Sequence, residues 1–191
     1  MRILILLAVI LAPAAMVHAA VSRQRHPYVK HWKKSTYGKG AVARVGAGAG
    51  VAQMRHRPRN YGGGAAGFGK RLGAGATTHA VKTTVEHGIA AKLHEDLHYH
   101  RSNKSGVGPR LGHALKSTVV TQNTKTGKGT PAAGRVAGHA AAGAVSQGVL
   151  AGASGASTAG VGLAADAGAN VAREFWPKHK RAHTSRVAHL K

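Results

Sequence analysis

The sequence predicts a mainly α-helical fold, with a small glycine- and alanine-rich helical hairpin domain between a disordered basic N-terminal arm and a basic C-terminal tail. Apolar residues recur at helical spacing over residues 77–99, and small residues do so over residues 132–173. The hydrophobic fraction of 43% comes mostly from Ala and Val, with two Phe and two Trp. Such small side chains bury little area each, so a large conventional core is not expected.

The first 19 residues have the features of a secretory signal peptide. Arg2 provides a positively charged start, residues 3–11 form an apolar run, and Val17, His18 and Ala19 form a small-residue cleavage context. The apolar run is shorter than the about 20 residues that span a bilayer. We therefore expect an exported protein of the periplasm or cell envelope that loses its leader.

The chain is a polycation. It has 28 Lys and Arg against five Asp and Glu, a net charge of +23, and 14 histidines that add charge in acid. Outside the cytoplasm the available polyanions are anionic lipid, surface polysaccharide and released nucleic acid. We expect binding to one of these, tightened at mildly acidic pH. Because the chain has no cysteine, disulfide bonds cannot stabilise the fold.

Residues 20–66 are predicted to be the disordered basic arm, residues 67–177 the helical domain and residues 178–191 the basic tail. In the arm, cations alternate with aromatic residues and follow neither a helical nor a strand period. This pattern suits a single-stranded nucleic acid, an anionic lipid interface or a solvated tail. The predicted polyanion-binding residues are Arg23, Arg25, Lys30, Lys33, Lys34, Arg55, Arg57, Arg59, Lys178, Lys180 and Arg181.

A helix is expected over residues 77–99, where an apolar ridge at i+4 spacing runs from Val81 to Leu97. Residues 102–108 suit a loop, and Pro109 suits the first position of a short helix. The polar residues 121–131 are compatible with a hairpin turn and with a plain loop.

Residues 132–173 are expected to form two closely approaching helices, joined near residues 150–157. Charged residues are scarce there, and small residues recur at every fourth position. This spacing lets helix backbones approach, within a membrane or in a soluble hairpin, and also allows self-association. The predicted helix-packing residues are Gly134, Gly138, Gly160 and Gly168.

One motif has a catalytic interpretation. His94, Glu95 and His98 satisfy H-E-x-x-H, in which two histidines on one helix face bind Zn²⁺ and the glutamate activates water. The extension that supplies a third ligand is absent, and a helix would point both histidines away from the apolar ridge. We therefore expect a protein that is not an enzyme and needs no cofactor. A zinc metallopeptidase is the alternative, beside opportunistic metal binding at His94 and His98.

Three segments carry a resemblance to a protein family. They are EDLHY (95–99), PRLGHALKST (109–118) and DAGANVAREFWP (166–177). Over about residues 68–180 the chain resembles an uncharacterised family of exported, glycine-rich bacterial envelope proteins. The resemblance implies an envelope setting and no known activity. In that family pattern the acidic pair and Tyr99 matter more than the histidines, and the chain lacks the aromatic-Pro element expected after Gln147.

The resemblance implies that the few acidic residues have a structural role. Glu95 and Asp96 are expected to pair with Arg101 or Arg110 and so fix the junction between two helices. By the same argument, Asp166 and Glu174 would meet Arg173 or Lys178.

Phe175 and Trp176 close the last predicted helix, because Pro177 disfavours helical geometry at the residue before it. They are either core anchors or a membrane-interface anchor beside the basic tail. The expected function is therefore adhesion of an envelope-associated polycation to an anionic surface. Extracellular nucleic-acid binding is the other non-enzymatic alternative.

Overall fold

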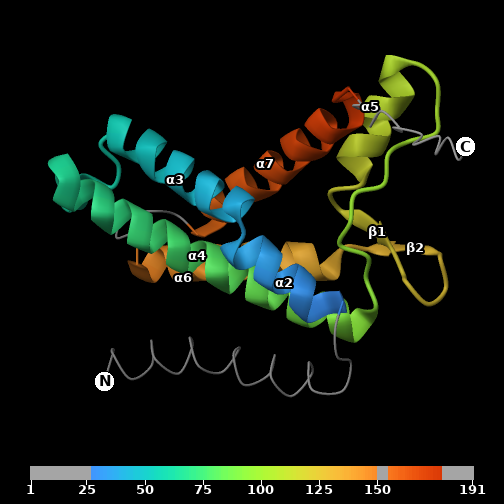
Figure 1. Cartoon of the computed structure of the whole chain (residues 1–191), viewed down its shortest axis with the longest axis horizontal. Coiled ribbons are helices and arrows are strands. Elements are labelled where there is room, and N and C mark those ends of the chain that lie inside the picture. The colour runs from blue at the N-terminus through green and yellow to red at the C-terminus, as the bar shows by residue number, and fades with distance from the viewer. Residues whose placement is uncertain (1–26, 150–154, 178–191) are drawn as a thin grey trace, which may run out of the picture.

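The computed structural model describes residues 27–149 and 155–177, which are mainly α-helical as predicted (Figure 1). The predicted leader and basic tail lie outside the described residues. In chain order the elements are α2 (Pro27–Tyr37), α3 (Lys39–Met54), the 3₁₀ turn η1 (Arg59–Tyr61), α4 (Gly64–Leu93), α5 (Val107–Lys116), β1 (Val120–Gln122), β2 (Gly129–Pro131), α6 (Ala133–Val149) and α7 (Gly155–Phe175).

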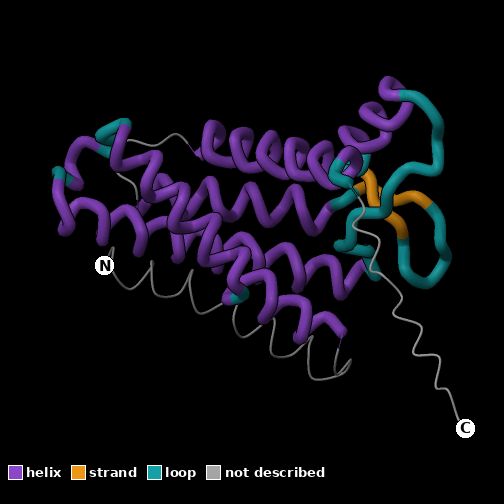
Figure 2. Tube along the Cα trace, turned by 45° about the horizontal axis from the view of Figure 1, so that its top comes forward, coloured by secondary structure: helices purple, strands orange, loops and turns teal. Residues whose placement is uncertain are grey.

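Helix α4 is the centre of the fold. It contacts α2, α3 and α6, while α7 packs on α6 and α5 packs on α7. The short strands lie at one end of this helical body (Figure 2). Helix α4 therefore brings together the N-terminal helices α2 and α3 and the later helix α6, which are far apart in the sequence.

The prediction of a disordered arm is wrong for residues 27–54, which form α2 and α3. Polar side chains hold α2 on α4: Trp32 Nε1 donates to Thr84 Oγ1 at 3.2 Å, and the hydroxyls of Thr36 and Thr83 lie 2.8 Å apart. Gly38 separates the two helices, and a Cβ there would lie 2.2 Å from the carbonyl oxygen of Lys34. The contacts that hold α2 are polar, so no apolar period announced it in the sequence. Helix α3 packs instead through small residues, with Ala41 and Ala49 buried and Val45 beside Gly75 of α4.

Helix α4 begins and ends earlier than the apolar ridge predicts. It starts at Gly64 and stops at Leu93, where His94 adopts the left-handed conformation with φ of 58° and its N–H bonds to the carbonyl of Ala90. Residues 94–99 are therefore not helical, although Leu97 continues the i+4 spacing.

Helix α5 and the β-hairpin follow. The helix starts at Val107, two residues before Pro109. The polar segment 121–131, for which a hairpin and a loop were both open, forms the hairpin, with Val120 paired to Pro131 and Gln122 to Gly129. The Asn123 side chain accepts backbone hydrogen bonds from the first residues of the turn.

Alanine dominates the apolar core. Ala90 and Ala114 are fully buried. The largest fully buried side chains in the described part of the chain are polar: Glu95, Glu174 and Ser146. The core is therefore small in apolar area, and its buried polar groups depend on specific partners.

Glycines bring α6 close to its neighbours within the chain. A Cβ on Gly134 or Gly138 would lie 2.7 Å from the Glu86 carbonyl or 2.8 Å from the Lys82 carbonyl of α4. The other two predicted helix-packing residues, Gly160 and Gly168, have no atom of the described residues within 4 Å of such a Cβ, so the described helices do not meet there. A role in self-association stays a prediction for these two positions. The approach of α6 to α7 occurs at other glycines, Gly143 and Gly155.

Candidate functional site

The H-E-x-x-H motif does not lie on a helix. His94 caps the end of α4, Glu95 forms an isolated β-bridge with Asn123, and His98 lies in the following loop. The two histidines therefore lack the shared helix face on which the zinc interpretation depends. Among the described residues no group of three or more His, Cys, Asp or Glu is arranged to hold a metal ion.

Glu95 caps a helix. Its carboxylate accepts the backbone N–H of Ala133 on Oε1 and of Gly134 on Oε2, both at 3.0 Å. The residue is 1% exposed. A buried carboxylate bonded to the first turn of α6 satisfies helix N–H groups and interacts favourably with the helix dipole. It has no free oxygen edge facing solvent, so the general-base role considered for Glu95 is wrong.

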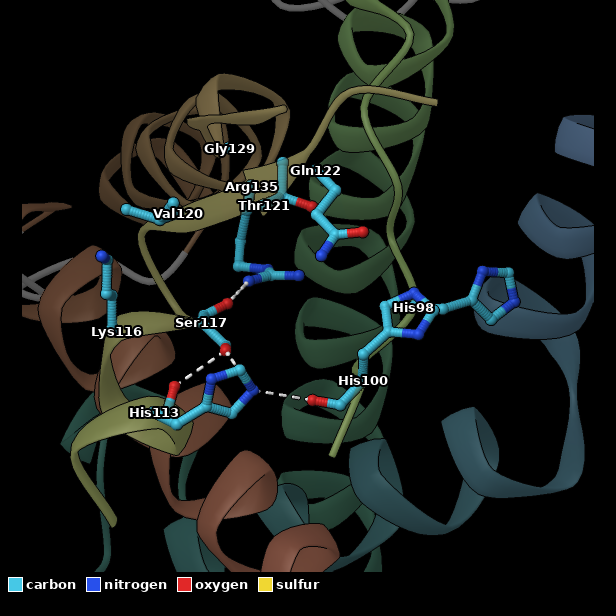
Figure 3. Close-up of a pocket in the computed structure, with 10 residues that line it drawn as sticks. All are labelled: His98, His100, His113, Lys116, Ser117, Val120, Thr121, Gln122, Gly129 and Arg135. Carbon is cyan, nitrogen blue, oxygen red and sulfur yellow. Dashed lines mark hydrogen bonds between the residues drawn. The ribbon is translucent and has the colours of Figure 1, made fainter. Parts of the chain in front are cut away.

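A small pocket of about 200 Å³ beside the hairpin gathers His98, His100 and His113 with Arg135 (Figure 3). Each histidine has a partner within the chain: His98 Nδ1 and His100 Nε2 contact Asp96 at 3.1 and 2.8 Å. His113 Nε2 lies 2.9 Å from the His100 carbonyl. His98 points away from the other two, and its ring centroid lies 4.5 Å from that of His31 on α2.

Glu174 joins α7 to the α5 region. Its carboxylate accepts Arg110 Nε at 2.8 Å, the Tyr99 hydroxyl at 2.7 Å and the Ser102 N–H at 3.0 Å. The Arg110 hydrogen bond lowers the pKa of Glu174 to about 2, while burial and the hydrogen bond to Glu174 raise the pKa of Tyr99 to about 12. The expected partner Arg173 instead contacts Asn170.

Asp166 joins α7 to α4 and α6. Lys82 Nζ lies 3.0 Å and His139 Nε2 2.8 Å from Asp166 Oδ2. Burial alone would raise the pKa of Asp166, but the hydrogen bond from His139 and the charge of Lys82 hold it well below its usual range. The carboxylate is therefore ionised and engaged by both neighbouring helices.

All five acidic residues of the chain are thus used in internal contacts. Glu86 lies 3.3 Å from Lys82 and 3.7 Å from Arg135. Asp96 contacts His98 and His100 of the small pocket, and the other three acids cap or join helices as described above. The expected pairing of Glu95 and Asp96 with Arg101 or Arg110 is therefore not found. The exposed charged side chains of the described residues are therefore mainly cationic.

The structure describes six of the predicted polyanion-binding residues, and all six are exposed. Lys30, Lys33 and Lys34 share the outer face of α2, opposite the side chains that contact α4. Arg55, Arg57 and Arg59 follow the end of α3. The others, Arg23, Arg25, Lys178, Lys180 and Arg181, lie outside the described residues.

The aromatic pair at the end of α7 is exposed rather than buried. Trp176 is 63% exposed and Phe175 38%. The Arg110 guanidinium lies 4.7 Å from the Phe175 ring centroid, and Arg101 donates to the Trp176 carbonyl at 2.9 Å. The core-anchor interpretation is therefore wrong for Trp176, and its ring is accessible to a partner.

A groove of about 980 Å³ was not foreseen from the sequence. It has Val45, Ala49 and Ala52 of α3 on one side and Val161 and Ala165 of α7 on the other. Its residues come from four helices and from the turn after α3. No sequence motif could have found it, because single small residues on each helix line it.

Arg71 is a second feature, after the groove, that the sequence analysis did not identify. It lines the groove and is 3% exposed. Its guanidinium donates to the carbonyls of Arg57, Pro58 and Gly62 and to Gln53 Oε1, at 2.8–2.9 Å. These acceptors are all neutral, so the charge of this buried cation is not balanced by a carboxylate.

No protein-family model, curated protein or solved structure matches the chain. Within the described residues, no helix combines the length and apolar character that crossing a bilayer requires.

Proposed function

We propose that this protein is a non-enzymatic, exported polycation of the cell envelope that adheres to an anionic lipid surface through its exposed lysines and arginines. The observation that carries the proposal is the use of every carboxylate in an internal contact. Cations on the surface therefore have few acidic neighbours to neutralise them. Their summed field attracts anionic surfaces at distances up to about a Debye length.

Helix α2 supports the proposal. Its inner face is fixed on α4 by Trp32 and Thr36, so Lys30, Lys33 and Lys34 are held together on the opposite face. Three lysines on one helical face form a compact cationic patch for lipid head groups. The exposed Trp176 ring offers an interfacial side chain at another place on the surface.

Vesicle sedimentation tests the proposal. The mature chain should bind vesicles that contain phosphatidylglycerol and not vesicles of phosphatidylcholine alone. Binding should weaken steeply as salt rises from about 0.1 M to about 1 M, because the Debye length falls from about 10 Å to about 3 Å. Equal binding to both vesicles would contradict the proposal. If the chain binds RNA or polysaccharide and does not bind anionic vesicles, the proposed ligand is that polyanion and not lipid.

A charge-matched pair of variants locates the surface. The triple variant Lys30→Gln, Lys33→Gln, Lys34→Gln should lose roughly 100-fold in affinity, at about 1 kcal/mol for each lysine near the membrane. The control, Lys104→Gln, Lys125→Gln, Lys128→Gln, removes the same charge from exposed loop positions. This control should lose clearly less affinity for anionic vesicles than the α2 variant does. Equal losses would mean that net charge alone, and not α2, determines binding.

A further inference from the structure

The groove between α3 and α7 has two chemically different parts. Its walls on α3 and α7 are mainly apolar, with Val45 and Ala49 on α3 and Val161 and Ala165 on α7. The cluster of Lys82, His139 and Asp166, whose charges satisfy one another, also lines it. In Figure 1, α3 and α7 lie on the same side of α4. At 980 Å³ the groove is at the upper end of the range for small-molecule sites, about 300–1,000 Å³.

One end of the groove is cationic. Arg57, Arg59 and the buried Arg71 all line it there. Arg71 is held rigidly by its four neutral acceptors. Because no carboxylate accepts from it, its positive charge remains available to attract an anion at that end.

A polar atom within the groove also lacks a partner. The hydroxyl of Thr78, on the α4 floor, is buried and makes no hydrogen bond among the described residues. Buried hydroxyls are almost always satisfied. This hydroxyl marks a polar point on the groove floor that a water molecule, and not a hydrocarbon chain, can satisfy.

We propose that the groove binds one long-chain carboxylate, with its hydrocarbon chain between α3 and α7 and its carboxylate at Arg57, Arg59 and Arg71. The apolar walls fit a single chain, and the arginine end fits its charge. The exposed guanidinium groups of Arg57 and Arg59 can donate bidentate hydrogen bonds to the carboxylate. Arg71, whose N–H groups are mostly used within the chain, contributes its positive charge. This site is separate from the lysine patch of α2, so the inference goes beyond the proposed function and does not depend on it.

Calorimetric titration of the mature chain with oleate below its micelle concentration tests the proposal. Oleate should bind as one molecule per chain. Oleyl alcohol has the same hydrocarbon chain without the charge, and its affinity should be lower by about ten-fold or more. Equal affinities for the two would overturn the carboxylate assignment, as would stoichiometries that rise without saturation.

A pair of glycine variants on α3 tests the hydrocarbon part. Gly48 lines the groove, and Gly40 of the same helix does not. A Cβ at either position meets no atom within 4 Å, so a side chain can begin at both without a clash at its first atom. Circular dichroism of both variants checks that the helical fold is kept. Gly48→Phe should abolish oleate binding and Gly40→Phe should leave it unchanged. If Gly48→Phe binds oleate as well as the parent chain does, the groove is not the site.

A pair of arginine variants tests the charged end. Arg59 lines the groove and Arg55 does not, although both are exposed. Arg59→Gln should weaken oleate binding about ten-fold and leave the affinity for oleyl alcohol unchanged, whereas Arg55→Gln should alter neither. A chain that dimerises, binds no oleate and becomes monomeric on Gly48→Phe would assign the groove to a second copy and overturn the proposal.

Discussion

The buried carboxylate of Glu95 accepts the backbone N–H of Gly134 at 3.0 Å, and this bond ties the end of α4 to the start of α6. The two residues are also in close contact, since a Cβ on Gly134 would lie 3.0 Å from Glu95 Oε2. The Glu95 carboxylate can cap α6 only because residue 134 has no side chain. A larger residue at 134 would displace the carboxylate that satisfies the helix.

Replacing Glu95 should destabilise the fold. Glu95→Ala removes both acceptors from the first turn of α6, and we expect the free energy of unfolding to fall by about 2 kcal/mol. Glu95→Gln keeps one oxygen acceptor and should lose about 1 kcal/mol. Urea denaturation of the two variants measures this. Equal stability of Glu95→Ala and the parent chain would rule out the capping role.

Two glycine-to-alanine substitutions on α6 and α7 should act in opposite directions. Gly138→Ala places a Cβ 2.8 Å from the Lys82 carbonyl, a backbone atom that cannot move freely. We expect a loss of about 1–3 kcal/mol. Gly160→Ala meets open space on α7, so higher helix propensity should stabilise the protein by about 0.5–1 kcal/mol. Thermal unfolding compares the pair, and a stabilising Gly138→Ala would contradict the packing described here.

The hydroxyl of Tyr99 should titrate at unusually high pH. Burial and its hydrogen bond to the Glu174 carboxylate raise its pKa to about 12. Glu174→Gln removes the negative charge, so the pKa of Tyr99 should fall toward 10. The difference in ultraviolet absorbance between each protein and its Tyr99→Phe counterpart, followed against pH, isolates this residue. An unchanged titration in Glu174→Gln would show that burial alone raises the pKa.

Stability should decrease in mild acid. Burial lowers the pKa of His31, His79 and His87, and neighbouring histidine rings lower that of His31 further. The unfolded chain then binds protons more readily than the folded one. Stability from these residues is therefore complete above pH of about 6.5 and is lost as the pH falls below it.

The paired variant His31→Gln, His87→Gln tests this dependence, because it removes two of the three groups. Its urea midpoint should change less between pH 7.5 and pH 5 than that of the parent chain, whereas the exposed His56→Gln should match the parent. Parallel pH profiles for all three proteins would contradict the argument. Because their pKa values are lowered, His31, His79 and His87 become charged only at lower pH. Any tightening of polyanion binding in mild acid therefore depends on the exposed histidines.

The helical elements of the second half of the chain could be predicted because their signals are local. Helices α6 and α7 follow from the helical spacing of small residues, and the short helix α5 from its glycine-rich entry and Pro109. The N-terminal helices could not be predicted. Helix α2 contacts α4 through residues about 50 positions apart, such as Trp32 with Thr84 and Thr36 with Thr83, and polar pairs leave no periodic trace in the sequence. Helix α3 buries only small side chains, Ala41 and Ala49, which give a weak hydrophobic signal.

In the candidate sites, too, local sequence patterns did not show which distant residues come into contact. The i+4 spacing that ends at Leu97 extended the predicted helix through His94 and created the apparent zinc site, although the chain leaves the helix at Leu93. Glu174 meets Arg110 and not the nearby Arg173, because the fold brings together residues 64 positions apart. Residue types predicted the presence of structural acids, and only the tertiary arrangement determined their partners.

The alanine-dominated core also affects how the protein responds to temperature. The heat capacity change of unfolding grows with the apolar surface that unfolding exposes and is reduced by exposed polar surface. Here alanines and buried carboxylates occupy positions that leucine or phenylalanine fill in other domains. The heat capacity change per residue is therefore small, and the curve of unfolding free energy against temperature is broad and shallow, with cold denaturation displaced to lower temperature.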